Sequence, residues 1–501
     1  MTAGASAIAA TAGGSLLPLA ILLPALGVLL SFLIGGRRAE WIALGLMPVE
    51  FAVAVAIACL VWRSGHPLVY TLAGYTPPLG IALRADGFSA VMVVTTGLIA
   101  PAAALYARTA FATPQELTEK RAPLVFWTLL QGIQAALSLV FLGGDLFNLY
   151  VGLELLTFAA VPLVSLDGRP ETVAAALRYL LFALFGSVFY LLGVALLYGA
   201  YGTLDIALLA PLVRPEPAVW LAAGLMTAGL LAKTALFPLH LWLPPAHANA
   251  PAAASGVLSG LVVKGSFFLV VRLWFDVLAA LPGVIPGTIL ATLGSAAILF
   301  GSVLALRQAR LKLLIAYSTV AQIGYLFIMF PLGHGPWAAD AFSGGVMQAL
   351  SHAFAKAAMF LSAGLIAESL GHDRIAGLGG AARAMPVTFF ALGLGGLSLM
   401  GLPPSGGFAA KWLLMKASIE AGQWVWAIVM AAGGLLAGGY LYRVLAPALS
   451  GESPALKTAP ARSRESIALA LALVALLLAF APPSFFAFLQ IGRPAAGLAL
   501  Q

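Results

Sequence analysis

Apolar runs of about 20 residues recur along the whole chain, and their length is what most limits how the chain can fold. A helix of about 20 apolar residues crosses the hydrocarbon core of a bilayer. The pattern therefore predicts an all-α polytopic membrane protein of about 14 transmembrane helices. The fourteen runs lie at about 16–35, 41–62, 87–106, 123–142, 145–166, 175–200, 218–240, 251–274, 284–306, 311–330, 341–369, 384–415, 422–447 and 465–489.

The composition supports the same class. Of the 501 residues, 62% are hydrophobic and 9% are charged, whereas a soluble protein carries about 25% charged residues. The single cysteine, Cys59, cannot by itself form a disulfide, a zinc site or an iron–sulfur ligand set. No phosphate-binding or dinucleotide-binding loop is present. We therefore expect no cofactor and no metal, and the net charge of +8 reflects loop charges rather than a nucleic-acid partner.

Loop charges give a topology, because Lys and Arg accumulate on the cytoplasmic side of membrane proteins. When alternate loops are assigned to opposite sides of the membrane, one side carries 16 Lys and Arg residues and the other carries 6. This asymmetry predicts a multi-pass protein of the inner (plasma) membrane with both termini on the outer, periplasmic side. The larger set is Arg37, Arg38, Arg108, Lys120, Arg121, Arg169, Arg178, Arg307, Arg310, Lys312, Arg374, Arg383, Arg443, Lys457, Arg462 and Arg464. The smaller set is Arg63, Arg84, Arg214, Arg272, Lys416 and Arg493.

Four further lysines fall inside apolar spans. A charge at the bilayer centre costs about 2.5–3.5 kcal/mol on insertion scales, so such residues usually face a hydrated interior and mark ion or proton paths. We expect a proton path through some of them. These lysines are Lys233, Lys264, Lys356 and Lys411.

Carboxylates and histidines within the spans could partner these lysines. Glu154, in "NLYVGLELLTF", is the expected buried partner of Lys233. His352 and Lys356 are four residues apart and share a helix face. Structural alternatives remain open: Lys411 could extend to the interface, Lys356 could bond a carbonyl or a serine, and Glu50 could satisfy a neighbouring helix.

Prolines interrupt two of the lysine-bearing spans. "AKTALFPLHLWLPPAHANAP" (232–251) contains His240 and His247, which are further candidates for the path, and "GLPPSGGFAAKWLL" (401–414) leads into Lys411. Broken helices at membrane depth line polar cavities, and paired breaks indicate an inverted repeat. The expected units are helices 1–3 (1–122), a first five-helix repeat (123–275), a second one (276–447), and a linker with helix 14 (448–501). Helices 7 and 12 are the broken ones. Residues 63–86 are expected to form a small surface hairpin.

These motifs, together with "ALSHAFAKAAMFLSAG", resemble the antiporter-like subunits shared by Mrp-type multisubunit cation/proton antiporters, respiratory complex I and membrane-bound hydrogenases. The resemblance covers about residues 85–445. It implies a fourteen-helix fold with two inverted five-helix repeats around a hydrophilic axis. In such subunits the positions of Glu154 and Lys233 form a pair, and those of Lys264, His352 and Lys411 continue the path. Within this family, two features of the chain are most similar to the D-type subunit of Mrp antiporters. These features are the lysine at position 411 and the absence of a long C-terminal lateral helix. Pro245 and Glu50 depart from the family pattern.

The sequence therefore predicts a proton-translocating membrane subunit of a multisubunit complex, with sodium as a candidate counter-ion. The proton path comprises Glu154, Lys233, Lys264, His352 and Lys411, with His240, His247 and Lys356 as secondary members. The partners are other membrane subunits, protons and lipid. One alternative is a pumping subunit of a complex I-like or hydrogenase-type redox complex. Another is a membrane anchor that couples protons to a peripheral enzyme, for example one that handles inorganic carbon. An enzyme acting alone is not indicated, because the chain has no nucleophile–base pair.

The charge asymmetry makes the topology testable. Both termini are predicted to lie outside the cytoplasm. A reporter that works only outside the cytoplasm should therefore give a signal when it is fused after Gln501. Activity instead from a reporter that works only in the cytoplasm would contradict this topology.

Overall fold

The computed structural model describes residues 9–112 and 121–493, which form a bundle of long helices. Lys120 and Gln501, used in the charge count and the reporter prediction, lie outside these residues. The long helices are α2 (Leu16–Ile34), α3 (Arg38–Ser64), α4 (Gly87–Ala107), α5 (Arg121–Leu142), α6 (Leu146–Val164), α7 (Pro170–Tyr201), α9 (Pro217–Thr234), α12 (Val263–Arg272), α13 (Val284–Arg307), α14 (Leu311–Leu326), α15 (Ala338–Leu370), α17 (Pro386–Met400), α18 (Gly406–Glu420), α19 (Trp424–Leu449) and α20 (Arg462–Leu477).

Short elements join or extend these helices. The π-helical turns η2 and η3 run without a break into α12. The short elements are η1 (Leu72–Gly74), α8 (Ile206–Leu209), α10 (Leu243–Asn249), α11 (Ala252–Val257), η2 (Leu258–Val262), η3 (Leu273–Val277), η4 (Phe327–Leu332), η5 (Ile375–Gly377), α16 (Ala381–Ala384), η6 (Leu478–Phe480) and α21 (Pro483–Leu489). The strands β1 (Leu68–Thr71) and β2 (Ala82–Ala85) pair antiparallel, which confirms the hairpin expected in residues 63–86.

The predicted fold class is confirmed. In the part of the chain that the structure describes, thirteen helices are long and apolar enough to cross a membrane. The remaining predicted span, the twelfth, is one of the two broken ones: α17 and α18 together cover residues 386–420, with a non-helical segment between them. The chain is thus a multi-pass, all-α membrane protein. Its division into two inverted five-helix repeats stays a prediction.

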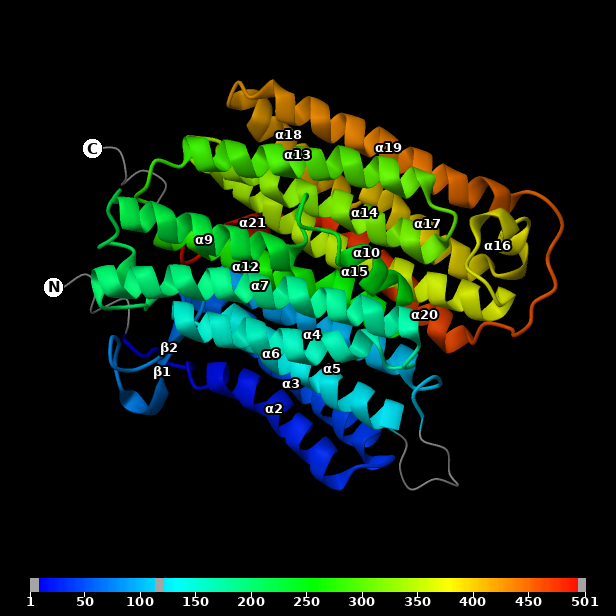
Figure 1. Cartoon of the computed structure of the whole chain (residues 1–501), viewed down its shortest axis with the longest axis horizontal. Coiled ribbons are helices and arrows are strands. Elements are labelled where there is room, and N and C mark those ends of the chain that lie inside the picture. Colours follow the sequence, from blue (N-terminus) through cyan, green and yellow to red (C-terminus); the bar gives the residue numbers. More distant parts are fainter. Residues whose placement is uncertain (1–8, 113–120, 494–501) are drawn as a thin grey trace.

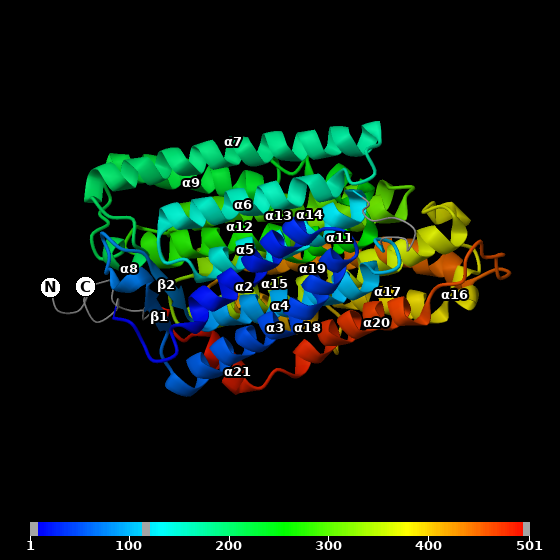
Figure 2. The same cartoon turned by 90° about the horizontal axis from the view of Figure 1, so that it is seen from below.

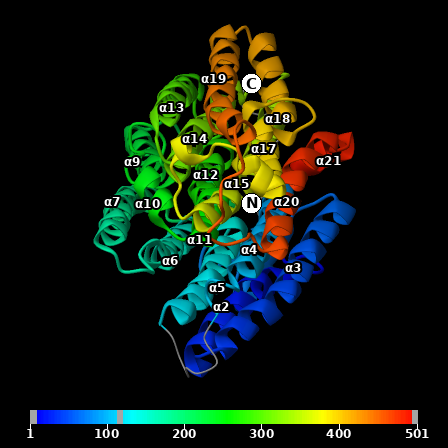
Figure 3. The same cartoon turned by 90° about the vertical axis from the view of Figure 1, so that its right-hand side faces the viewer.

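The long helices run side by side along one direction (Figure 1), and the same arrangement is seen from below (Figure 2). Viewed end-on, α15 lies near the middle of the bundle, while α7, α3 and α19 lie at its periphery (Figure 3). Burial agrees with this picture, because α15 and the segment Ala252–Val277 are buried along nearly their whole length. Small residues explain the central position of α15: Gly344, Gly345 and many alanines let neighbouring backbones approach closely, which drives helix packing in lipid.

Both predicted helix breaks are present. Helix α9 ends at Thr234, and Ala235 adopts a left-handed conformation (φ 59°) that turns the chain away from the helix axis. The chain then runs through Pro238 before α10 begins. In the second break, α17 ends at the left-handed Gly401 (φ 81°), and Ser405 caps α18 by accepting a hydrogen bond from the Phe408 N–H (3.1 Å). Each break leaves helix-end carbonyls available to side chains.

Two glycines allow α7 and α9 to cross at contact distance. A Cβ atom on Gly229 would lie 2.3 Å from the carbonyl oxygen of Gly186, and one on Gly186 would lie 2.6 Å from the Gly229 oxygen. The same hypothetical atom on Gly186 would lie 3.2 Å from Cγ of Lys233. The crossing therefore sets how α9 presents Lys233 to the helices around it.

Both described ends of the chain contact the β1–β2 hairpin. The Thr11 N–H donates to the Val69 oxygen (3.0 Å), and Arg84 Nη2 donates to the Gly492 oxygen (2.8 Å). The two ends thus lie at the same end of the bundle, as an even number of spans requires.

The α7–α9 crossing makes a prediction for Gly229→Ala. The added methyl group has no room, so we expect the helices to separate and stability to fall by about 1–3 kcal/mol. Thermal unfolding of the purified chain in detergent measures this loss. Gly224→Ala on the same helix is the matched control, because a Cβ there meets no atom within 4 Å. Equal unfolding temperatures for the two variants would contradict the packing argument.

Candidate functional site

Glu154 and Lys233 form a buried ion pair between α6 and the C-terminal end of α9. Lys233 Nζ lies 2.9 Å from Glu154 Oε1 and 3.1 Å from Thr157 Oγ1. Ser187 on α7 also donates to the Glu154 carboxylate. The side chains of the pair are only 6% (Lys233) and 14% (Glu154) exposed, so each charge depends on the other for its stabilisation. The pairing expected from the sequence is thus present.

Polar and aromatic side chains lead from this pair into the bundle. Thr234, next to Lys233, donates to Ser266 Oγ on α12 (2.9 Å). Trp242 stacks on Tyr179 (4.1 Å between ring centroids) and donates its indole N–H to the Ala232 oxygen (2.9 Å). Trp242 also meets the ring of His247 edge-on at 6.2 Å. The broken part of helix 7 therefore connects the ion pair with the interior of the bundle.

Lys264 is fully buried, and a π-helical turn provides its partner. Its Nζ donates to the carbonyl oxygen of Ser259 (2.5 Å), which lies in η2. A π turn shifts hydrogen bonding to i→i+5 and so alters which carbonyls are available, and such turns are frequent at functional sites. Ser259 Oγ also lies 3.0 Å from Thr319 Oγ1 on α14. Lys264 is thereby tied to the second half of the chain.

A group of buried basic side chains lies where α10, α12, α14 and α15 meet. His247 is placed among the ammonium groups of Lys264, Lys312 and Lys356, and His352 lies near Lys264, Lys356 and His247. Neither ring nitrogen of either histidine has a hydrogen-bond partner among the described residues. The structure thus brings His247 and Lys356 into the same cluster as Lys264 and His352.

Uncharged polar groups connect this cluster with Lys411. Lys356 Nζ donates to the Ile315 oxygen (2.9 Å) and to Ser318 Oγ (2.5 Å). The hydroxyl of Tyr440 lies near Ser318 and Gln322 but makes no hydrogen bond among the described residues. Gln322 Nε2 in turn donates to the Leu399 oxygen (3.0 Å), and that oxygen also accepts from Lys411.

Lys411 itself lies across the second helix break. Its Nζ donates to the carbonyls of Leu399 (2.6 Å) and Met400 (3.1 Å) at the C-terminal end of α17, and it sits 4.2 Å from the ring centroid of Tyr325. The carbonyl end of a helix stabilises a cation. Lys411 is 5% exposed, so its side chain lies inside the bundle. The alternative in which Lys411 extends to the membrane interface is therefore wrong.

Two residues singled out in the sequence lie elsewhere. The ring of His240 packs against Phe237 and Phe300, away from the lysine cluster. Glu50 accepts a hydrogen bond from Gln134 Nε2 (2.7 Å) and links α3 to α5. That contact matches the structural alternative for Glu50, in which it satisfies a neighbouring helix.

Sequence reasoning missed several residues of the buried polar series. The sequence predicts a loop position for Lys312, but this residue is 9% exposed and donates to the Ala250 carbonyl. Its place two residues after Arg310, at the start of a span, gave no signal of burial. Gln322 and Gln348, which hydrogen bond to each other (3.0 Å), did carry a signal, because amides inside apolar spans need partners.

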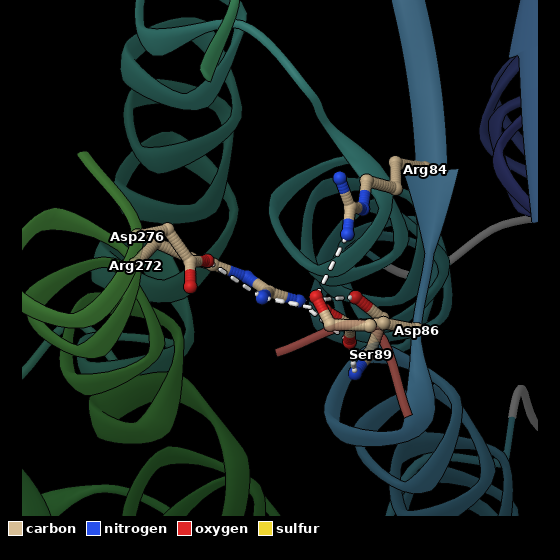
Figure 4. Close-up of polar contacts among 6 residues, drawn as sticks. Arg84, Asp86, Ser89, Arg272 and Asp276 are labelled. Carbon is tan, nitrogen blue, oxygen red and sulfur yellow. Dashed lines mark hydrogen bonds and ion pairs between the residues drawn. The ribbon is translucent and has the colours of Figure 1, made fainter. Parts of the chain in front are cut away.

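A second ion-pair cluster closes the end of the bundle that carries the hairpin (Figure 4). Arg272 pairs with Asp86 (2.6 Å) and Asp276 (2.8 Å) and donates to Ser89 Oγ (2.9 Å). Its guanidinium also lies 4.7 Å from the ring centroid of Phe268. The sequence counts Arg272 with the loop residues of the smaller set, and the structure places it in the last turn of α12 with its side chain 12% exposed.

Asp86 caps α4 from outside the membrane-spanning segment, accepting from the Ser89 N–H (2.9 Å). Burial alone would raise the pKa of this carboxyl. The charge and hydrogen bonds of Arg272 outweigh burial, with smaller help from Arg84 and the Ser89 N–H, and they hold the pKa of Asp86 below its usual value.

Within residues 9–112 and 121–493, no three His, Cys, Asp or Glu side chains come together as metal ligands. The buried series is dominated by lysine, which in its charged form only donates hydrogen bonds. Basic groups placed close together in this way can exchange protons with one another.

The fold and this buried series define a class: many-helix membrane proteins with a polar interior. Residues 143–437 match the model of the family described as NADH:quinone oxidoreductase/Mrp antiporter, transmembrane. The chain belongs to this family.

Relatives and solved structures agree with that assignment. The chain is 37% identical over 398 residues to NADH-quinone oxidoreductase subunit N of Desulforudis audaxviator (78% of this chain, 77% of the relative). It is 28% identical over 387 residues to the D-type subunit of the Na(+)/H(+) antiporter of Alkalihalophilus pseudofirmus (77% and 76%). A chain in the Mrp complex structure from Dietzia sp. DQ12-45-1b superposes with a TM-score of 0.87 at 25% identity, covering 97% of this chain and 98% of that one. Relatives of both kinds match, so the family follows from the comparison but the partner complex does not.

The Asp86–Arg272 pair makes a pH-dependent prediction. The folded-state pKa of Asp86 lies below its unfolded value of about 3.9, so the stabilisation is complete above that pH and is lost as pH falls through the folded pKa. Asp86→Asn leaves Arg272 paired with Asp276 alone, and near neutral pH we expect a loss smaller than the roughly 3–5 kcal/mol of a buried charge left unpaired. Unfolding in detergent at neutral and acidic pH measures this, and the gap between variant and wild type should narrow in acid.

The control for this experiment is Asp340→Asn, which removes an exposed pair with Lys416 (2.8 Å) and should change stability little. A gap between Asp86→Asn and wild type that stays constant down to acid pH would show that Asp86 does not act through its charge.

Proposed function

We propose that this chain is a proton-translocating subunit of a multisubunit membrane complex. A single feature supports this function best: the buried basic groups form one series from Glu154–Lys233, through Lys264 and His352, to Lys411. Ser318, Gln322 and backbone carbonyls fill the interval before the last lysine. Buried ionisable residues in membrane spans are costly, and proton relays are among their main uses.

The Glu154–Lys233 pair is the step that can be switched. While Glu154 is charged and 2.9 Å away, Lys233 retains its proton. If Glu154 is neutralised or moves, the ammonium is left buried without a counter-charge, and release of the proton removes that cost. The released proton passes towards the cluster around Lys264. Thr157 and Ser187 hold the two side chains in place between such events.

The middle cluster makes the transfer cooperative. Lys264, Lys356, His247 and His352 lie within electrostatic range of one another, and like charges at short range disfavour simultaneous protonation. Protonation of one member therefore promotes release from its neighbour, and the set titrates together rather than as separate sites. Because the histidine ring nitrogens have no partner among the described residues, and buried polar groups usually bond protein or water, water completes the route here.

At the far end, Lys411 receives the proton and releases it. Its ammonium is stabilised by the Leu399 and Met400 carbonyls rather than by a carboxylate. Dipoles of this kind hold a cation less strongly than a counter-ion does, so Lys411 is suited to give up its proton. Both termini are proposed to lie on the outer side, in accordance with the 16-to-6 distribution of basic residues.

Two of the candidate partner complexes have support from relatives, and the membrane anchor for a peripheral enzyme stays an untested alternative. Exchange of protons for sodium follows from the likeness to the D-type subunit of the Na(+)/H(+) antiporter. Pumping coupled to a redox reaction in partner subunits follows from the higher identity, 37%, to NADH-quinone oxidoreductase subunit N. Co-purification of the intact complex and identification of its subunits distinguishes the two.

Substitution of Lys233 tests the relay itself. Arginine keeps its charge at accessible pH, so Lys233→Arg is expected to preserve the pair with Glu154 and yet abolish proton flux. Glu154→Ala, which leaves a buried lysine unpaired at a cost of about 3–5 kcal/mol, is also expected to abolish flux. Proton flux is measured in vesicles that carry the complex at matched abundance of this chain.

The matched control is Lys416→Arg, a lysine-to-arginine change in an exposed pair with Asp340, which should leave flux unchanged. Near-normal flux with Lys233→Arg would show that Lys233 only holds the fold together, and the relay would have to be abandoned.

A further inference from the structure

A groove opens at the end of the bundle that carries the basic loops, between the start of α3, the end of α4 and the start of α20. Its volume is about 660 Å³. The residues that matter for its chemistry are Arg37, Glu40, Trp41, Leu105, Arg108 and Arg464. Helix α4 packs against both α3 and α20. We propose that this groove binds the anionic headgroup of a membrane phospholipid, with the phosphate between Arg108 and Arg464.

The charge of the groove is suited to a phosphate. Three arginines and one glutamate line it. Arg108 Nε lies 3.0 Å from Glu40 Oε1, and Arg464 Nη1 lies 2.7 Å from Glu368 Oε2. A guanidinium has five N–H donors, so one carboxylate contact leaves donors for a second anion. Guanidinium groups match phosphate geometry well.

Arg464 carries the most specific signal. Its side chain is 8% exposed, and its Nε is buried without a hydrogen-bond partner among the described residues. The guanidinium lies 4.3 Å from the ring centroid of Tyr106, which holds it in position. A buried donor of this kind is costly unless it is paired. Arg464 also lines the groove, so a phosphate bound there would lie beside its guanidinium.

The surroundings favour a lipid over a free anion. Trp41 is 58% exposed at the rim, and its ring lies under Arg108 (5.2 Å); exposed tryptophan is typical of the headgroup level. Below the groove, Leu98 and Leu105 are exposed on one face of α4, and Leu477 is exposed on α20. A headgroup bound by the arginines would thus have its acyl chains over apolar helix faces. Such a lipid would join α20 to the N-terminal helices.

Lipid retention and thermal stability of the purified full-length chain test this site. Native mass spectrometry in mild detergent counts bound phosphatidylglycerol and phosphatidylcholine, and thermal unfolding is followed with each lipid and with inorganic phosphate. Wild type is expected to retain phosphatidylglycerol preferentially. Arg108→Gln is expected to weaken that binding about fivefold, which is about 1 kcal/mol for one arginine near an anionic headgroup.

Arg108→Gln could fail to fold because it breaks the pair with Glu40. Arg37→Gln is the second variant for that case, because it leaves the Arg108–Glu40 pair intact. The matched control is Arg169→Gln, an exposed arginine paired with Asp167 (2.5 Å) away from the groove, which should not change lipid retention. Three results would overturn the site: no preference of wild type for phosphatidylglycerol, equal retention in Arg108→Gln and Arg169→Gln, or stabilisation by inorganic phosphate equal to that by the lipid.

Discussion

The cost of keeping an ammonium group inside an apolar bundle is the constraint on which the rest of this structure depends. Each buried lysine meets it with a different partner. Lys233 has the carboxylate of Glu154, Lys264 has a carbonyl in a π turn, and Lys411 has the carbonyls at the end of a broken helix. Irregular backbone next to Lys264 and Lys411 supplies the carbonyls that these two lysines bind, whereas Lys356 shares the Ile315 carbonyl of the regular helix α14.

These partners differ in a way that bears on function. A carboxylate can be neutralised by a proton, whereas a backbone carbonyl cannot change its charge. In the proposed relay, only the Lys233 end of the series has a partner whose electrostatic effect can be switched, and the lysines beyond it respond to one another. The electrostatic cluster of His247, Lys264, His352 and Lys356 gives that response a physical route. The two ends of the bundle are held by ion pairs of another kind, such as Asp86–Arg272, in which arginine does not exchange protons.

Much of the architecture could be predicted because apolar length and helix breakers act locally. The run at 341–369 became α15, and the Pro-Gly segment before Lys411 became the gap between α17 and α18. The prediction of a loop position for Lys312 was wrong for the opposite reason. A basic residue at the end of an apolar run has the same sequence context whether it faces solvent or the interior, and only the neighbouring helices decide. His240 and His247 likewise share one proline-rich segment, yet one packs against phenylalanines and the other lies among lysines.

The sequence by itself determined that this chain crosses the membrane many times, that two of its helices are broken, and that charges are buried within it. These properties follow from residue type and spacing along the chain. Only the tertiary structure decided which carbonyl each lysine binds, that Ser318 and Gln322 connect the cluster to Lys411, and that Arg464 lies at a groove between α4 and α20. Those contacts join residues far apart in sequence, and their geometry depends on how helices cross, as at Gly186 and Gly229, where a single methyl group would separate them.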